Sequence, residues 1–128
     1  MTDEKKQTIL IVEDEPSLRD VLRDKLTIEG FAVLQAVDGE EGLEVILREH
    51  PDLILLDIMM PKMDGLTMLK MLRADAWGAK AKVILLTNSS DNEKVAEAMA
   101  QGTYDYLVKS DWKIDDVAAK IRERLSAE

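Results

Sequence analysis

Five short apolar runs alternate with five amphipathic segments along the chain, and this alternation constrains the fold more than any other feature. The runs are rich in Ile, Val and Leu, and each has the length of one strand. Strands that are apolar on both sides are typical of sheets covered by helices on both faces. The five runs are Thr8–Val12, Phe31–Ala36, Leu53–Leu56, Lys82–Leu86 and Tyr104–Val108.

The segments between the runs have apolar residues at helical spacing. The first follows Pro16 and stops before Gly30, the second covers Gly39–Glu49, and the third follows Asp64 as its N-cap. The fourth covers about Asp91–Gln101, and the last carries a strong apolar stripe from Ile114 to Leu125. The residues expected to face inward in the first two helices are Leu18, Val21, Leu22, Leu26, Leu43, Ile46 and Leu47.

Five strand-then-helix repeats predict an α/β fold with a five-stranded parallel sheet, doubly wound by right-handed crossovers. The 128 residues fit one compact domain, and no Ser- or Pro-rich linker interrupts them. We therefore expect a single domain over residues 1–128, with its core at about 7–126.

Polar and charged residues occupy the carboxyl ends of four predicted strands. Glu13 and Asp14 follow the first strand, Asp57 the third, Thr87 the fourth and Lys109 the fifth. Open parallel sheets bind ligands beyond these ends. The sequence therefore predicts a functional site where these five residues meet.

These residue types suit phosphoryl transfer. Three carboxylates at one edge repel one another and favour a bound cation, and an all-oxygen set suits Mg²⁺ beside a phosphate. Lys109 offers a positive charge and Thr87 a hydroxyl to phosphoryl oxygens. A carboxylate nucleophile with a metal ion, a lysine and a hydroxyl is sufficient for in-line transfer.

Composition narrows the partners and the location. The net charge is −9, from 26 acidic and 17 basic residues, which argues against direct nucleic-acid binding. The chain has no cysteine, so disulfides and thiolate metal sites are excluded. No apolar run is long enough to span a membrane, so we expect no membrane association and a cytoplasmic location.

Four stretches of the sequence resemble the receiver domain of two-component response regulators, of the chemotaxis type that stands alone as a single domain. The resemblance keeps order and spacing over nearly the whole chain, and it implies the flavodoxin-like (βα)5 receiver fold with strand order 2-1-3-4-5. The stretches are IVEDEPSLRDVLRDKLTIEGF, PDLILLDIMMPKMDGLTMLKMLR, VILLTN and GTYDYLVKS.

The resemblance also implies a role for each site residue. Asp57 is the implied phosphoacceptor, and it binds Mg²⁺ together with Asp14 and the backbone carbonyl of Met59, while Glu13 acts through a water. Thr87 and Lys109 contact the phosphoryl oxygens in this scheme. Tyr106 is the switch aromatic that turns inward when Thr87 moves. Pro61, Asp64 and Gly65 shape the loop after the acceptor strand.

The implied partners are those of a phosphorelay. A sensor histidine kinase or a histidine phosphotransfer protein donates the phosphoryl group, and the downstream target is an unidentified protein. The output surface consists of the fourth helix, the fifth strand and the fifth helix, and the chain is a monomer or a weak dimer through that face. It is a signalling switch rather than an enzyme, catalysing only its own phosphorylation and dephosphorylation.

The chain departs from the family pattern at several positions. Glu13 replaces a common Asp, Asn88 follows Thr87 where a small residue is usual, and Thr103 replaces an Ala. Ser110 stands where the family has a proline joined by a cis bond to the lysine. Because a cis bond before a non-proline residue costs about 2.5–4 kcal/mol, we predict a trans Lys109–Ser110 bond, or else a strained cis bond.

Other interpretations remain open. Glu13 and Asp14 alone are also typical of a helix N-terminus, where acidic residues cap and favour the helix dipole. The alternative function is a pseudo-receiver, an interaction module that works without phosphorylation. An enzyme of the aspartyl phosphatase type is disfavoured. It needs a second acid two residues after the nucleophile, and that residue is Met59.

Overall fold

The computed structural model describes residues 6–87, 92–102, 105–108 and 113–126. Strands and helices alternate through the described chain in the predicted order. The strands are β1 (Thr8–Val12), β2 (Ala32–Ala36), β3 (Leu53–Asp57), β4 (Val83–Thr87) and β5 (Asp105–Val108). The helices are α1 (Pro16–Ile28), α2 (Gly39–Glu49), α3 (Gly65–Ala74), η1 (Gly78–Lys80), α4 (Asn92–Ala100) and α5 (Ile114–Ser126).

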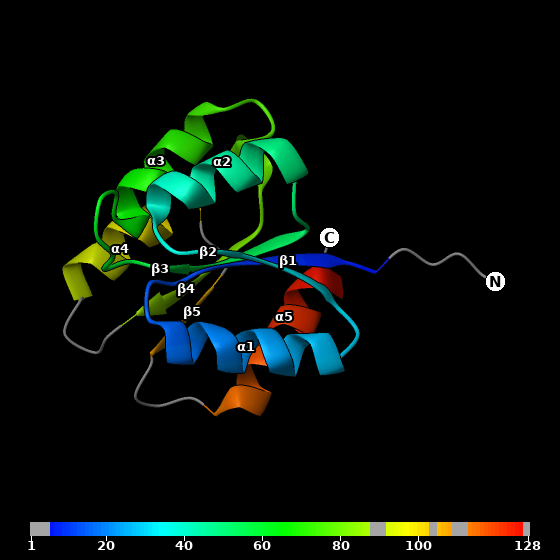
Figure 1. The fold of residues 1–128 in the computed structure, drawn as a ribbon. Helices are drawn as coiled ribbons and strands as arrows, with labels where there is room; N and C mark the ends of the chain where they lie inside the picture. Colours follow the sequence, from blue (N-terminus) through cyan, green and yellow to red (C-terminus); the bar gives the residue numbers. More distant parts are fainter. Residues whose placement is uncertain (1–5, 88–91, 103–104, 109–112, 127–128) are drawn as a thin grey trace.

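The five strands form one parallel sheet in the order β2-β1-β3-β4-β5, which confirms the predicted α/β fold (Figure 1). Val12 pairs with Leu56, and Asp57 pairs with Leu86 on the next strand. This register brings the carboxyl ends of β1, β3 and β4 to the same edge of the sheet. The residues that end those strands are therefore neighbours in space although they are far apart in sequence.

The sheet separates two apolar layers because successive side chains of a strand point to opposite faces. Leu10 and Val12 of β1 pack under α2 and α3, while Ile9 and Ile11 pack under α1 and α5. Figure 1 shows α2 and α3 on one side of the sheet and α1 and α5 on the other. Every residue of β3 and of β4 is buried, as expected for strands covered on both faces.

Two residues predicted to face inward lie at the surface instead. Val21 in α1 is 51% exposed, and Leu47 in α2 is 42% exposed. Each follows or precedes a fully buried neighbour, Leu22 or Ile46, and adjacent helical residues point about 100° apart. In these two pairs Leu22 and Ile46 face the sheet, and the 100° rotation carries Val21 and Leu47 toward solvent. In α2 the inner face uses Val45 instead.

Helix ends follow the residues that the sequence offers. Asp38 caps α2 by accepting a 2.9 Å hydrogen bond from the Glu41 amide, and Asp64 caps α3 through the Thr67 amide at 2.7 Å. Pro16 begins α1, where its missing N–H costs no helical bond. In the described part of the chain, every helix is too short or too polar to cross a membrane.

Candidate metal centre

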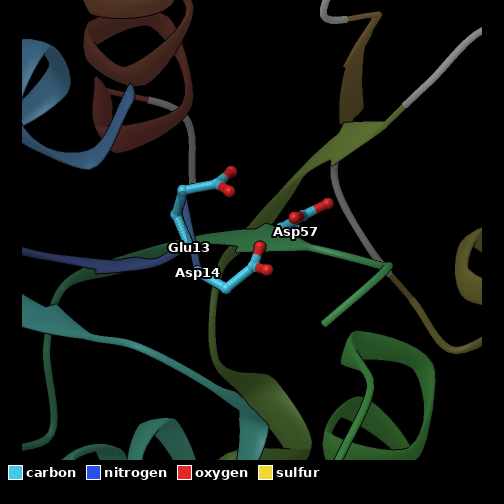
Figure 2. A group of neighbouring side chains, drawn as sticks. All are labelled: Glu13, Asp14 and Asp57. Atoms are coloured by element: carbon cyan, nitrogen blue, oxygen red, sulfur yellow. The ribbon is translucent and has the colours of Figure 1, made fainter. Parts of the chain in front are cut away.

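Three carboxylates gather at the carboxyl edge of the sheet. Glu13 and Asp14 directly follow β1, and Asp57 is the last residue of the neighbouring strand β3. One carboxylate oxygen from each lies within 4.8 Å of the others. Figure 2 shows the three side chains at the ends of the two strands, with their carboxylates directed toward a common region. The topology thus brings together three acids that are up to 44 positions apart in sequence.

Burial makes this arrangement costly without a cation. Glu13 is 0% exposed and Asp57 is 3% exposed, whereas Asp14 faces solvent. The repulsion between two carboxylates at such separations is on the order of 3 kcal/mol near a protein surface, before screening by solvent. A bound cation would remove that repulsion, so the electrostatics of the cluster favour a metal ion.

Glu13 is held in place by hydrogen bonds to the end of β2, to α1 and to its own loop. Its backbone N–H donates to the Ala36 carbonyl at 3.1 Å, and its carbonyl accepts a 2.9 Å hydrogen bond from Arg19. Its side chain accepts from the Glu15 amide at 3.1 Å. The N-cap of α1 is Glu15, which makes no side-chain cap bond. Neither Glu13 nor Asp14 is therefore the N-cap of this helix.

Asp57 lies against the loop that leads to α3. Its Oδ1 accepts a hydrogen bond of 3.3 Å from the Met59 amide. The Gly65 amide donates to the Ile58 carbonyl at 2.8 Å, so the loop returns to its starting point. Gly65 fits because a Cβ there would lie 2.2 Å from the Asp57 carbonyl oxygen. The end of β3 and the start of α3 are therefore in direct backbone contact.

Thr87 lies at the same edge of the sheet. It is the last residue of β4 and follows Leu86, the residue that pairs with Asp57. Thr87 is 1% exposed, although a hydroxyl has little reason to be buried for packing alone. Its position is compatible with contact to a group bound at Asp57, and that role stays a prediction.

Several predicted residues lie outside the described part of the chain. Lys109 and the predicted trans bond to Ser110 fall there, as do Asn88 and Thr103. Tyr106 is described: it lies on β5, pairs with Leu85 of β4 and is 42% exposed. The predicted switch aromatic is therefore turned outward in this structure.

The donor set fits a hard divalent cation. Glu13, Asp14 and Asp57 offer only oxygen ligands, which suit Mg²⁺ or Ca²⁺ rather than the softer metals that prefer thiolate or imidazole. Mg²⁺ commonly binds through one or two carboxylates and keeps several waters. Asp14 is exposed, so waters can reach the cluster from its side.

Two contacts that support the site were not predicted. One is the hydrogen bond from Arg19 to the Glu13 carbonyl, and the other is a contact between Gly39 and the backbone of Met63. A bond from a side chain to a backbone carbonyl six residues away leaves no periodic pattern in a sequence. The DG pair at Asp38–Gly39 was a possible signal, because a glycine beside a cap often marks a close backbone approach.

Curated relatives cover almost all of this chain. It is 39% identical over 120 residues to "Probable transcriptional regulator ycf27" from Porphyridium aerugineum, covering 94% of this chain and 48% of that protein. It is 36% identical over 117 residues to "DNA-binding dual master transcriptional regulator RpaA" from Synechocystis, covering 91% and 48%. The chain spans about half the length of the curated relatives that it matches.

These relatives correct one expectation. The acidic charge predicted no direct nucleic-acid binding, yet relatives of this chain are named as DNA-binding transcriptional regulators. The prediction is wrong because net charge describes only the part of the sequence in which it is counted. The acidic balance of this chain excludes nothing about the half of those proteins that it does not cover. The relatives likewise do not support the expected chemotaxis-type, single-domain protein.

A solved structure with the same fold contains a metal ion. The receiver domain of sensor histidine kinase PA1611 from Pseudomonas aeruginosa PAO1 is 27% identical and has a TM-score of 0.87. The match covers 96% of this chain and all of that one. That structure has a magnesium ion coordinated in its active site cleft.

The family model for the response regulator receiver domain matches residues 9–122 of this chain. That span runs from β1 into α5 and includes all three clustered carboxylates. The strand order, the acidic cluster at the carboxyl edge and the relatives agree with the match. The chain belongs to the response regulator receiver domain family.

Proposed function

We propose that this chain is a phosphoacceptor in a two-component phosphorelay, and that Asp57 takes its phosphoryl group from a phosphohistidine donor. One observation carries the proposal: Glu13, Asp14 and Asp57 offer oxygen atoms within 4.8 Å of one another at the carboxyl edge of the sheet. The buried Thr87 at the end of the adjacent strand adds support. A purely structural sheet edge gains nothing from three acids gathered this closely.

In this proposal Asp14, Asp57 and the backbone carbonyl of Met59 hold Mg²⁺, with Glu13 acting through a coordinated water. When bound, the ion neutralises negative charge on the acceptor and on the transferring phosphoryl group. Glu13 is buried and hydrogen-bonded, so it fixes the inner side of the site. Asp14 lies on the solvent side, where the donor must approach.

The transfer itself makes one bond and breaks another. A carboxylate oxygen of Asp57 attacks phosphorus, a P–O bond forms, and the P–N bond to the donor imidazole breaks. The imidazole keeps the electron pair and takes a proton. Later a water attacks the same phosphorus, releasing inorganic phosphate and restoring the carboxylate. The chain thus catalyses only its own phosphorylation and dephosphorylation.

The signal then passes to the surface of α4, β5 and α5. Phosphorylation adds charge and strong acceptor oxygens at Asp57, and the Thr87 hydroxyl and the predicted Lys109 are drawn toward them. Movement of Thr87 makes room for Tyr106, which is now 42% exposed, to turn inward. Partner binding changes because phosphorylation shifts the populations of the two forms.

The direct test is intact mass after incubation with Mg²⁺ and a small phosphodonor such as acetyl phosphate. We expect one added phosphoryl group, which Asp57→Asn removes and a metal chelator suppresses. Asp24→Asn is the matched control, because it removes an acidic charge from the exposed side of α1, remote from the cluster. This control is expected to be labelled like the wild type.

Each other outcome has a definite meaning. An adduct that survives in Asp57→Asn places the acceptor at another residue and contradicts the proposal. A wild-type chain that stays unmodified with the small donor and with a phosphorylated histidine phosphotransfer domain favours the pseudo-receiver alternative. Labelling that is insensitive to chelator contradicts the role of Mg²⁺ while keeping the acceptor.

A further inference from the structure

The loop between β3 and α3 is anchored at both of its ends. At its first end, the Gly65 amide donates to the Ile58 carbonyl at 2.8 Å. At its far end, the Gly39 amide donates to the Met63 carbonyl at 3.1 Å. Gly39 belongs to α2, which follows β2 rather than the acceptor strand. The loop beside Asp57 is therefore held partly by an element that contributes no residue to the acidic cluster.

The contact at Gly39 leaves no space for a side chain. A Cβ on Gly39 would lie 2.4 Å from the Met63 carbonyl oxygen and 3.0 Å from its carbonyl carbon. Real Cβ atoms essentially never approach a heavy atom within 3.0 Å, and the neighbour here is backbone rather than a flexible side chain. An alanine at this position must push the loop away from α2.

Two side-chain hydrogen bonds to backbone amides stabilise the first turn of α2. The Asp38 side chain accepts from the Glu41 amide at 2.9 Å, and the Glu41 side chain accepts from the Val37 amide at 2.8 Å. This pair is close to a capping box, except that Glu41 accepts from the residue before the N-cap rather than from the N-cap itself, and both bonds hold the start of the helix. Asp38 is 5% exposed, and its Oδ2 lies 3.8 Å from the Lys62 ammonium of the loop. The start of α2 thus meets the loop at two neighbouring points.

We propose that Gly39 is a positioning residue for the metal site. It lets the start of α2 hold the loop of residues 58–64, and so sets the place of the Met59 carbonyl. The inference rests on the proposed function, which assigns that carbonyl to Mg²⁺. Mg²⁺ demands near-ideal octahedral geometry, whereas Ca²⁺ accepts flexible coordination. A displaced carbonyl should therefore weaken Mg²⁺ binding more than Ca²⁺ binding.

The test compares Gly39→Ala with Gly42→Ala by nuclear magnetic resonance titration with Mg²⁺ and with Ca²⁺. Gly42 lies in the same helix, and a Cβ there would meet the Val12 side chain at 3.0 Å and the Met68 sulfur at 3.1 Å. That variant stresses the core without touching the loop. Thermal unfolding without metal measures the stability cost of each substitution.

For Gly39→Ala we expect the Kd for Mg²⁺ to rise about tenfold, the scale of losing a group that orients a ligand. The Kd for Ca²⁺ should rise much less, and Gly42→Ala should keep the wild-type ratio of the two constants. Mg²⁺ binding in Gly39→Ala that equals the wild type overturns the inference. Equal losses for both ions also overturn it, because they indicate general damage.

Amide hydrogen exchange in the wild type decides the question if Gly39→Ala does not fold. Coupling between two sites is reciprocal, so Mg²⁺ should slow exchange of the Gly39 amide as well as that of the loop. The C-terminal turn of α2 is the internal control and should not respond. Slowing at Gly65 with no change at Gly39 overturns the inference.

The two proposals fail in different ways. A wild-type chain that binds no Mg²⁺ and takes no phosphoryl group overturns the proposed function, and the role of Gly39 falls with it. A wild-type chain that binds Mg²⁺ and is phosphorylated at Asp57, while Gly39→Ala behaves like Gly42→Ala, overturns the role of Gly39 alone.

Discussion

The guanidinium of Arg73 in α3 donates a 2.7 Å hydrogen bond to the Gln101 carbonyl just beyond the end of α4. The same group donates to the carbonyls of Gly78 at 2.7 Å and Ala81 at 2.8 Å, which lead into β4. Those carbonyls belong to a helix end and to a turn, where the backbone has few partners of its own. Arg73 therefore joins three segments through one side chain.

Arg73→Gln is expected to lower the free energy of unfolding by about 2–4 kcal/mol, because charged hydrogen bonds are lost and part-buried carbonyls lose their donor. Urea unfolding measures the change. The control is Arg48→Gln, an arginine of α2 that is 66% exposed and pairs with the adjacent Glu49. Its effect should stay within about 1 kcal/mol. Equal effects of the two variants would contradict the role of Arg73.

Binding of Mg²⁺ to the folded chain should raise its free energy of unfolding. Mg²⁺ at a hundredfold excess over its Kd is expected to raise the free energy of unfolding by about 2.7 kcal/mol. Asp57→Asn should be more stable than the wild type without metal, because one of three mutually repelling carboxylates is neutralised. It should also lose most of the response to Mg²⁺. Urea unfolding with and without the ion measures both effects.

The charge-matched control for this comparison is again Asp24→Asn, in an exposed part of α1. It should keep the full response to Mg²⁺ and show no stabilisation without it. If Asp57→Asn and Asp24→Asn respond equally to the ion, the acidic cluster is not where Mg²⁺ binds.

The carboxyl-edge cluster was predictable from sequence because it depends on the order of elements. Parallel strands with their carboxyl ends at one edge must bring Asp14 and Asp57 together once β1 and β3 are neighbours. The contact of Gly39 with Met63 was not predictable in this way, because it depends on the path of a loop. The inward-facing residues of a helix were only partly predictable. Periodicity selects a stripe but does not choose between adjacent Val21 and Leu22.

Truncation of those two residues should give very different losses. Leu22 is fully buried in the apolar layer between the sheet and helices α1 and α5. Leu22→Ala is therefore expected to lower the free energy of unfolding by about 2–5 kcal/mol through lost burial and a cavity. Val21 is 51% exposed, so Val21→Ala should change stability by about 0.5 kcal/mol or less. Thermal or urea unfolding of both variants checks this. Similar losses would mean that the face of α1 toward the sheet is misassigned.

Glu29 at the end of α1 connects that helix to α5. Its carboxylate pairs with Arg122 of α5 and, at 3.1 Å, with Lys25 of its own helix. The hydrogen bond from Arg122, and then that from Lys25, hold the pKa of Glu29 below its usual value of 4.5. The pKa is therefore lower in the folded chain than in the unfolded one. Such a group contributes stability above the unfolded pKa, and the contribution is lost as the pH falls through the folded pKa.

Glu29→Gln should therefore unfold at a lower temperature than the wild type near neutral pH. The difference between the two unfolding temperatures should vanish as the pH falls below 4.5 through the folded pKa of Glu29. Added salt should also narrow the gap at neutral pH, because Arg122 is half exposed and the pair is screened. Glu44→Gln, an exposed glutamate of α2, is the control and should show a small gap at both pH values. Thermal unfolding of the wild type and both variants across the pH range, with and without salt, measures these differences. A gap that stays constant or widens in acid would mean that the charge of Glu29 does not stabilise the contact between α1 and α5.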